Sequence, residues 1–391
     1  MINKAYKYRM YPNKSQEDLL QKHFGHCRFV YNHFLQVKIN HYKETKKTIN
    51  WQDLATQLPK LKQENEWLKE IGSQSLQQSI LNLDRAYTAF FRSNFGFPKF
   101  KSRKYARKSF IVPITNGNIK LNYDNSRLII PKFKDGIKCV FHREVEGKLK
   151  QVTISQDHDG KYYASVLVEI NKELPIKLPP NKNKAIGIDF GVKTFLTLNN
   201  GEKIENPKFL KQSLDKLKKH QQVLELLEKD TVKRKSKQEQ ITKLNSKIAR
   251  QRKDFLDKLS YKLTHDNQVD TICIEDLSVK KMQQDNYKPT NKILADLSWN
   301  KFVNMLQYKS DWNGKNFLKI GRFEPSSKMC SCCGNINHSL TLDNREWTCI
   351  KCNTKHDRDV NAAKNIVDFA FPKTKFLQGR NYPIEAPMAL A

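Results

Sequence analysis

Four cysteines near the C-terminus, with an acidic segment directly after them, are the strongest chemical signal in the chain. They have the spacing C-x2-C-x15-C-x2-C and are Cys330, Cys333, Cys349 and Cys352. Two close pairs of thiolates at this separation are typical of a tetrahedral site for structural zinc. Cys332 offers an alternative ligand, although the C-x2-C spacing favours Cys330 with Cys333. His356 also lies nearby, but with four cysteines present we expect it not to bind the metal.

Three carboxylates at the ends of separate predicted elements are candidates for a second metal site. Asp189 and Glu275 each end a short apolar strand, and Asp359 begins a helical run. The carboxyl ends of strands are where open α/β sheets present groups to ligands. If the acids converge, their repulsion is severe unless cations such as Mg²⁺, which takes oxygen ligands, neutralise it. Taken singly, each acid could equally be a turn residue or a helix N-cap.

The net charge of +31 points to a polyanionic partner. The 391 residues include 71 lysines and arginines against 40 aspartates and glutamates. Such an excess opposes self-association and favours nucleic acid, bound specifically or, as in ribosomal proteins, nonspecifically. No stretch approaches the ~20 apolar residues that span a bilayer, and no basic helix has a clean apolar face, so we expect no membrane partner. The dispersed remaining cysteines indicate a reducing, cytoplasmic compartment.

A basic and aromatic segment and the first strand are the candidate nucleic-acid-binding surfaces. Residues 92–110 hold seven lysines and arginines interleaved with aromatic residues. Cations neutralise phosphates and rings stack on bases, although a solvated basic loop whose rings enter a core has the same composition. The candidate nucleic-acid-binding residues are Lys4, Lys7, Arg9, Lys99, Lys101, Arg103 and Lys104.

The first half of the chain changes from helical to strand-like patterning. Residues 4–11 suit a short strand, and Asn13 with Gln16 predicts a capping box at the start of the next helix. Helical apolar spacing then continues through residues 14–92. The following short apolar runs, with a hairpin signal at 157–160, predict a small β-barrel or sandwich.

The second half follows a proline-rich linker and mixes strands with helices. Residues 185–191 and 194–198 predict two strands, and residues 271–274 predict a third. Residues 208–264 are highly charged but keep helical apolar spacing, so they predict a long helical hairpin that turns around residues 233–236. The lysines of this pair could contact nucleic acid or simply face solvent.

Taken together, these motifs resemble a known family. The segments Gly187–Lys193, Ile274–Val279 and Asp357–Ile366, with the four-cysteine ribbon before the last, are similar to the RuvC domain of the TnpB proteins. TnpB proteins are encoded by bacterial insertion sequences and are relatives of type V CRISPR effectors. Further matching segments extend the resemblance over essentially the whole chain, at residues 7–12, 27–32, 97–102 and 204–208.

The resemblance implies a multidomain α+β fold. Its expected parts are the N-terminal strand of a wedge β-barrel (1–13), a helical recognition domain (14–110), the rest of the barrel with a linker (111–180), and a RuvC-like nuclease domain of the RNase H fold (181–391). The nuclease domain would contain the helical hairpin at about 208–264 and the zinc ribbon at about 325–356. Asn353 stands where the family usually has glycine, and asparagine also tolerates the left-handed turn of such a knuckle.

The resemblance also implies an RNA-guided endonuclease that cuts double-stranded DNA next to a short flanking motif. The family's catalytic acids correspond to Asp189, Glu275 and Asp359, which would hold two Mg²⁺ ions for phosphodiester hydrolysis. Asp276 and Asp357 are expected to support them, and the zinc would be structural. The implied partners are a guide RNA derived from the transposon end and the target DNA, while the oligomeric state stays open.

Three other functions remain open from the sequence. The chain could be a guide-dependent repressor that binds DNA without cutting, a transposase that joins strands, or a zinc-ribbon protein that binds nucleic acid without catalysis. The intact acidic triad argues against the first, whereas in the third the acids would be incidental. Residues 381–391 have little pattern, and we expect them to be disordered.

Overall fold

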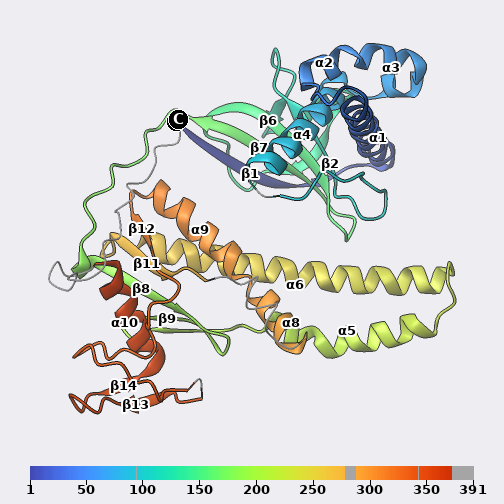
Figure 1. Ribbon diagram of the computed structural model, residues 1–391. Helices are drawn as coiled ribbons and strands as arrows, with labels where there is room; N and C mark the ends of the chain where they lie inside the picture. The colour runs from blue at the N-terminus through green and yellow to red at the C-terminus, as the bar shows by residue number, and fades with distance from the viewer. Residues whose placement is uncertain (94, 278–287, 342, 372–391) are drawn as a thin grey trace. The chain divides into compact units, whose positions relative to one another are not determined.

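The computed structural model describes residues 1–93, 95–277, 288–341 and 343–371 (Figure 1). The chain divides into two compact units, Met1–Glu173 with Lys235–Ser246, and Leu174–Arg234 with Lys247–Ala391. Part of the motif at Ile274–Val279 and the end predicted to be disordered, residues 381–391, lie outside the described residues.

A seven-stranded antiparallel sheet forms the base of the first unit, in the order β2-β6-β7-β1-β5-β4-β3. Strand β1 (Ile2–Tyr11) pairs along its length with β7 (Tyr162–Ile170) and at its end with β5 (Phe133–Val140). The N-terminal strand therefore completes a sheet whose other strands come much later in the chain, as predicted. The remaining strands are β2 (Lys108–Pro113), β3 (Lys120–Asn122), β4 (Arg127–Ile130) and β6 (Lys148–Gln156).

The predicted small β-barrel or sandwich is present in part, because these strands form one sheet that is a half-barrel. Strands β2 and β3 stand at its two edges. Helices take the place that a second sheet would fill, since the rings of Phe24 and Phe110 meet 5.6 Å apart and helical and strand residues share one core. The hairpin predicted at residues 157–160 does join β6 to β7, with Gly160 at φ +81°.

The helices of the first unit follow β1 directly. They are α1 (Lys14–Thr45), α2 (Trp51–Thr56), α3 (Leu58–Glu64), the 3-10 helix η1 (Glu66–Glu70) and α4 (Ser73–Arg92). The predicted capping box is present, because the Asn13 side chain accepts from the Gln16 amide and the Gln16 side chain accepts from the Asn13 amide. Strand β2 begins at Lys108, three residues inside the range expected to be helical.

A five-stranded mixed sheet, β10-β9-β8-β11-β12, forms the core of the second unit. Strands β8 (Ala185–Phe190) and β9 (Thr194–Leu198) form a hairpin, and β8, β11 (Thr271–Glu275) and β12 (Asn316–Ile320) are parallel. The hairpin and the buried strand were predicted. The short strands β10 (Lys203–Glu205), β13 (Glu346–Thr348) and β14 (Lys355–Asp357) and the 3-10 helix η2 (Lys182–Lys184) complete the strands and turns described here.

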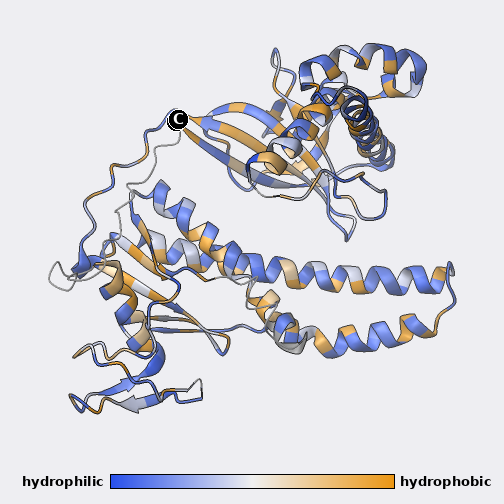
Figure 2. Cartoon of the chain, in the orientation of Figure 1, coloured by the Kyte–Doolittle hydropathy of each residue, from blue (hydrophilic) through white to orange (hydrophobic). Residues whose placement is uncertain are grey.

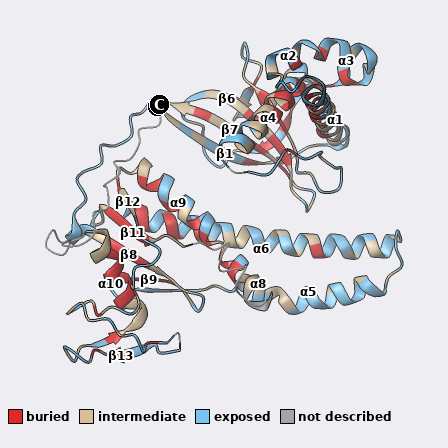
Figure 3. Ribbon diagram, viewed as in Figure 1, coloured by how far each residue is buried: buried red, intermediate tan, exposed pale blue. Residues whose placement is uncertain are grey.

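The helical hairpin consists of α5 (Phe209–Leu226) and α6 (Val232–His265), whose rings Phe209 and Phe255 lie 6.2 Å apart. Its turn lies at residues 227–231, before the predicted position, because the Thr231 side chain caps α6 by accepting from the Arg234 amide. Figure 2 shows α6 as mostly hydrophilic, and Figure 3 shows buried residues on β8, β11 and α10 but few on the hairpin. The other helices are α8 (Lys288–Leu297), α9 (Trp299–Trp312) and α10 (Arg358–Ala370).

None of the described helices has both the length and the apolar character needed to cross a lipid bilayer.

His23 of α1 is buried in the core of the first unit. Its ring stacks on Phe110, with centroids 4.6 Å apart, and its Nδ1 lies 2.8 Å from the Leu19 carbonyl oxygen, to which it donates when protonated. Burial lowers the pKa of His23 to about 4 from 6.5. Between pH 4 and pH 6.5, His23 therefore binds a proton in the unfolded chain but not in the folded unit.

We predict that the first unit loses stability as the pH falls from 6.5 toward 4. A histidine with a depressed folded pKa contributes its stability above the unfolded pKa and loses it as the pH falls through the folded pKa. The loss should reach about 3 kcal/mol at most, and His23→Gln should flatten the pH dependence of urea unfolding. His158→Gln, at an exposed position of the same unit, is the control. An unchanged slope in His23→Gln contradicts the assignment.

Candidate active site and zinc site

Two of the predicted acids lie side by side at the carboxyl edge of the second sheet. Asp189 follows Ile188 in β8, Glu275 follows Ile274 in β11, and these two isoleucines are paired in the parallel register. Both acids are partly exposed, unlike the buried residues before them. The parallel pairing therefore brings their carboxylates to the same edge, as the sequence predicted.

Asp359 reaches the same region because α10 crosses β8 at a glycine. A Cβ atom at Gly187 would meet the Ala363 carbonyl oxygen and the Val367 Cγ2 at 2.8 Å or less. Glycine thus permits a backbone contact that other residues exclude. The first turn of α10 contains Asp359, so the crossing sets how close that carboxylate lies to Asp189.

The pKa of Asp189 shows that the three acids interact. It is raised well above its usual value, first by burial and then by the negative charges of Asp359 and Glu275, while Arg358 opposes the shift. The pKa of Glu275 is also raised, first by burial and then by Asp276. A site that disfavours its own negative charge is stabilised by a cation, and carboxylate oxygens are the ligands that Mg²⁺ takes. The donor set therefore fits magnesium.

Two arginines engage the carboxylate of Asp359. Arg358 Nη2 lies 3.0 Å from Oδ1, and Arg345 Nη1, from the cysteine-rich segment, lies 3.3 Å from Oδ2.

Among the described residues, the four thiols are the one set of three or more potential metal ligands whose atoms all lie within 4.8 Å of one another. The three carboxylates are therefore more widely spaced than ligands of a single ion.

The neighbouring acids Asp276 and Asp357 have structural partners. Asp357 is the N-cap of α10, accepting from the amides of Asp359 and Val360, and its Oδ2 lies 2.6 Å from Lys203 Nζ. Asp276 Oδ2 lies 2.6 Å from Arg322 Nη2. Both acids therefore have structural partners, and the choice of Asp359 rather than Asp357 as an acid of the site stays a prediction.

The four predicted zinc ligands form a compact cluster. Cys330 and Cys352 have their Sγ atoms 3.6 Å apart, as do Cys333 and Cys349. Cys332 is exposed and lies outside the group of four cysteines that could hold a metal ion. Two matching turns shape the knuckles, with Gly334 at φ +74° and Asn353 at φ +56°, the left-handed conformation expected for Asn353.

His356 lies against the cluster without belonging to it. Its Nε2 is 3.1 Å from Cys330 Sγ, and its ring packs on Trp347 at 4.8 Å. A protonated Nε2 donates to the sulfur and favours the thiolate form that zinc requires. The sequence analysis expected only that His356 would not bind the metal, and its contact with the Cys330 sulfur is an additional finding.

Two buried asparagines connect α10 to the first knuckle, and the sequence analysis missed both. Asn361 accepts from the Ser331 amide at 2.9 Å and donates to the Met329 carbonyl at 2.7 Å. Asn365 donates to the carbonyls of Met329, at 2.6 Å, and Ser326, at 2.7 Å. Their i, i+4 spacing places both on one face of α10 and was the available signal. The first knuckle of the four-cysteine cluster and Asp359 are therefore positioned by the same helix.

The predicted nucleic-acid-binding residues fall in two places within the first unit. Lys4, Lys7 and Arg9 lie on β1, where Lys7 Nζ stands 3.9 Å from the centre of the Tyr163 ring. The others belong to the segment after α4 and are Lys99, Lys101, Arg103 and Lys104. Their contacts with nucleic acid stay predictions.

Three family models match parts of the chain. They are described as "Probable transposase" (OrfB_IS605, residues 165–286), "Cas12f1-like, TNB domain" (299–366) and "Helix-turn-helix domain" (HTH_OrfB_IS605, 1–47). The last range contains β1 and α1.

Curated relatives match nearly the whole chain. A "Putative RNA-guided DNA endonuclease" of Streptomyces pristinaespiralis is 34% identical over 94% of this chain and 89% of its own length. The "Putative RNA-guided DNA endonuclease InsQ" of Escherichia coli K12 is 30% identical over 93% of this chain and 91% of its own length. The solved structure titled "Structure of the mini-RNA-guided endonuclease CRISPR-Cas_phi3" overlaps 94% of this chain and 92% of its own, at 10% identity and a TM-score of 0.43, from which we conclude nothing further.

We predict that the protein binds about one zinc ion per chain through the four clustered cysteines. Cys333→Ala should lose the metal and lower the melting temperature, because an incomplete thiolate set holds zinc weakly. Cys332→Ala, one residue away and outside the cluster, should keep the metal. Metal content by mass spectrometry and thermal unfolding check both, and equal losses in the two variants contradict the ligand set.

We further predict that Gly187→Ala destabilises the second unit by about 3 kcal/mol or more, because the added methyl group collides with the backbone of α10. Urea unfolding measures the change. Gly321→Ala is the matched control in the same unit, since its nearest neighbour is a flexible Glu324 side-chain atom at 3.4 Å. Equal stabilities of the two variants would refute the close crossing.

Proposed function

Because the chain belongs to the TnpB family of insertion-sequence proteins, we propose that it is an RNA-guided DNA endonuclease. The observation that carries this proposal is the convergence of three acidic positions, because Asp189 and Glu275 lie on adjacent parallel strands and α10, whose first turn holds Asp359, crosses β8 at Gly187. Relatives named for this activity align over nearly their whole length, and the net charge of +31 suits a protein that binds two nucleic acids.

The nuclease site in this proposal consists of Asp189, Glu275 and Asp359, in a RuvC-like domain of the RNase H fold at residues 181–391. The three carboxylates would hold two Mg²⁺ ions, which when bound supply an activated water and stabilise the leaving oxygen of a phosphodiester. Asp189 and Glu275 approach from adjacent strands, whereas Asp359 approaches from α10. Since Asp359 is paired with Arg345 and Arg358, it must loosen these ion pairs to become a ligand.

The zinc cluster has a positioning role in the proposal. Asn361 and Asn365 join the first knuckle to α10, and Arg345 from the same ribbon contacts Asp359. A bound zinc ion would fix the knuckle against the helix that presents the third carboxylate. Loss of zinc should therefore weaken cleavage by displacing Asp359 as well as by lowering stability.

Target choice in the proposal belongs to a guide RNA derived from the transposon end. Base pairing selects the DNA, and the protein reads a short flanking motif, as in the analogous CRISPR effectors. The wedge sheet (1–13 and 111–180) and the helical module (14–110) would bind these nucleic acids. Lys4, Lys7, Arg9, Lys99, Lys101, Arg103 and Lys104 are the proposed contacts.

Strand joining is the second candidate, because one matching family model is described as a probable transposase. A strand-transfer assay separates the two functions. Cleaved but unjoined DNA supports the endonuclease, whereas a joined product supports the transposase.

We predict that Asp189→Asn abolishes guided DNA cleavage, with a fall of at least about 100-fold, because removing even a supporting partner of a metal ligand costs 10–100-fold. DNA binding by the RNA-loaded protein should persist. Asp311→Asn is the matched control in the same unit, since Asp311 pairs with Lys177 and is not one of the site's acids. Cleavage rates and DNA affinity are measured in Mg²⁺. Undiminished cleavage by Asp189→Asn overturns the site, and no cleavage by the wild type leaves a guide-dependent repressor.

A further inference from the structure

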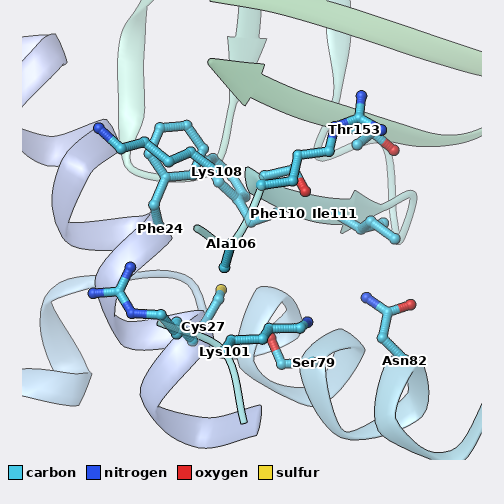
Figure 4. Close-up of a pocket in the computed structure, with 13 residues that line it drawn as sticks. Phe24, Cys27, Ser79, Asn82, Lys101, Ala106, Lys108, Phe110, Ile111 and Thr153 are labelled. Atoms are coloured by element: carbon cyan, nitrogen blue, oxygen red, sulfur yellow. The ribbon is translucent and has the colours of Figure 1, made fainter. Parts of the chain in front are cut away.

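A small basic cavity in the first unit is lined by Lys101, one of the contacts proposed above, and by cations to which no role has been given. Its volume is about 110 Å³, and it lies between α1, α4, the segment after α4 and the start of β2. Figure 4 shows Cys27 and Lys101 below the cavity, Lys108 and Phe110 above it, and Asn82 at its side. The volume equals that of about three or four waters, which suits a compact polar group rather than a base.

The lower wall of this cavity is fixed by two motifs that lie far apart in the sequence. The Asn32 side chain of α1 accepts from the Lys101 amide at 2.8 Å and donates to the Lys101 carbonyl at 2.9 Å. The Lys101 Nζ stands 3.6 Å from the centre of the Tyr31 ring. The basic segment is thereby held against α1, and the position of Lys101 does not depend on a ligand.

Five cations gather at or beside the cavity without an acidic partner. Within the described ranges, no ion pair with a carboxylate involves any of them, namely Arg28, Lys101, Arg103, Arg107 and Lys108. Lys108 Nζ instead donates to the neutral amides of Gln21, at 3.3 Å, and Gln156, at 3.1 Å. The cluster therefore carries uncompensated positive charge.

The pKa directions agree with this geometry. Burial lowers the pKa of Lys101. Burial and then Arg103 lower the pKa of Arg28, while burial, Arg103 and Arg28 lower that of Lys108. The charged forms are disfavoured in the free protein, and a bound anion removes both the repulsion and the desolvation cost.

Exposed aromatic residues on the same segment favour nucleic acid over a free anion. Phe95, Phe97, Phe100 and Tyr105 are all exposed, and Tyr105 has 78% of its surface accessible. Rings of this kind provide stacking surfaces for unpaired bases beside a phosphate contact. A single strand could thus place one phosphate in the cavity and its bases on the rings.

We propose that this cavity binds one backbone phosphate of the guide RNA, with Arg28, Lys101 and Lys108 as its cationic ligands and the Asn82 amide as a neutral donor. The inference rests on the proposed function for the identity of the strand. RNA is favoured over target DNA because an uncompensated cation cluster destabilises the protein whenever its anion is absent. A guide RNA is bound before and throughout target search, whereas target DNA is bound only at the end.

The anion site is tested first without any nucleic acid. The full chain is melted in potassium phosphate and in potassium chloride at equal ionic strength. The pocket variant is Arg28→Gln with Lys101→Met, and the matched control is Arg85→Gln with Lys60→Met, two exposed positions of the same unit. Phosphate should raise the melting temperature of the wild type and the control more than that of the pocket variant. Equal shifts in all three proteins overturn the site.

A second readout separates a binding role from a structural one. In chloride at low salt, the pocket variant should melt at or above the temperature of the control, because it loses repelling charges. A clearly lower melting temperature means that the cations are structural and overturns the proposal. Lys101→Arg keeps the charge and should retain the response to phosphate, whereas a lost response in this variant also counts against the site.

The source of the phosphate is tested with the RNA that copurifies with the protein and with RNA-loaded protein and target DNA. Relative to the control, the pocket variant should bind the RNA about tenfold more weakly, and the slope of log Kd against log salt should fall by about 1. Once loaded with RNA, it should bind DNA as the control does. Normal RNA affinity with weakened DNA affinity overturns the assignment to RNA. The thermal unfolding experiments in phosphate need neither guide RNA nor cleavage. Their outcome therefore tests the anion site independently of the proposed function.

Discussion

The close crossing of α10 over β8 at Gly187 is the constraint on which the rest of the second unit depends. No side chain separates the glycine from the Ala363 carbonyl, so the helix lies against the sheet at the strand that carries Asp189. One face of the same helix binds the zinc knuckle through Asn361 and Asn365, and its first turn carries Asp359. One backbone contact thus relates the metal cluster, the third carboxylate and the sheet edge.

The first unit depends on a different device, in which helices fill a half-closed sheet. Strand β1 lies between β7 and β5, so the first residues of the chain join segments that are more than a hundred residues away. Asn32 then attaches the basic segment to α1 at Lys101. The two candidate sites have opposite charges, because the second unit brings carboxylates together and the first unit brings cations together. A cation bound by the carboxylates and an anion bound by the cationic side chains would each reduce the repulsion between like charges.

The sequence predicted the features that rest on local patterns. The capping box at Asn13, the strands that carry Asp189 and Glu275 at or near their ends, and the four clustered thiols follow from spacing over a few residues. The incomplete closure of the first sheet, the turn before α6 and the arginines on Asp359 did not follow, because they depend on contacts between distant segments or on one capping threonine. The spacing of Asn361 and Asn365 predicts that both lie on one face of a helix. It does not predict that they bind the backbone of the first knuckle.

The most direct test of the guided function is the RNA that accompanies the protein. The gene is expressed with its native downstream DNA, the full chain is purified, and the bound RNA is sequenced, with expression without that DNA as the control. A discrete RNA with a constant scaffold and a variable end, present only when the downstream DNA is supplied, is the predicted result. Heterogeneous cellular RNA in both preparations would contradict a guided mechanism and leave a basic, metal-dependent nuclease or binding protein.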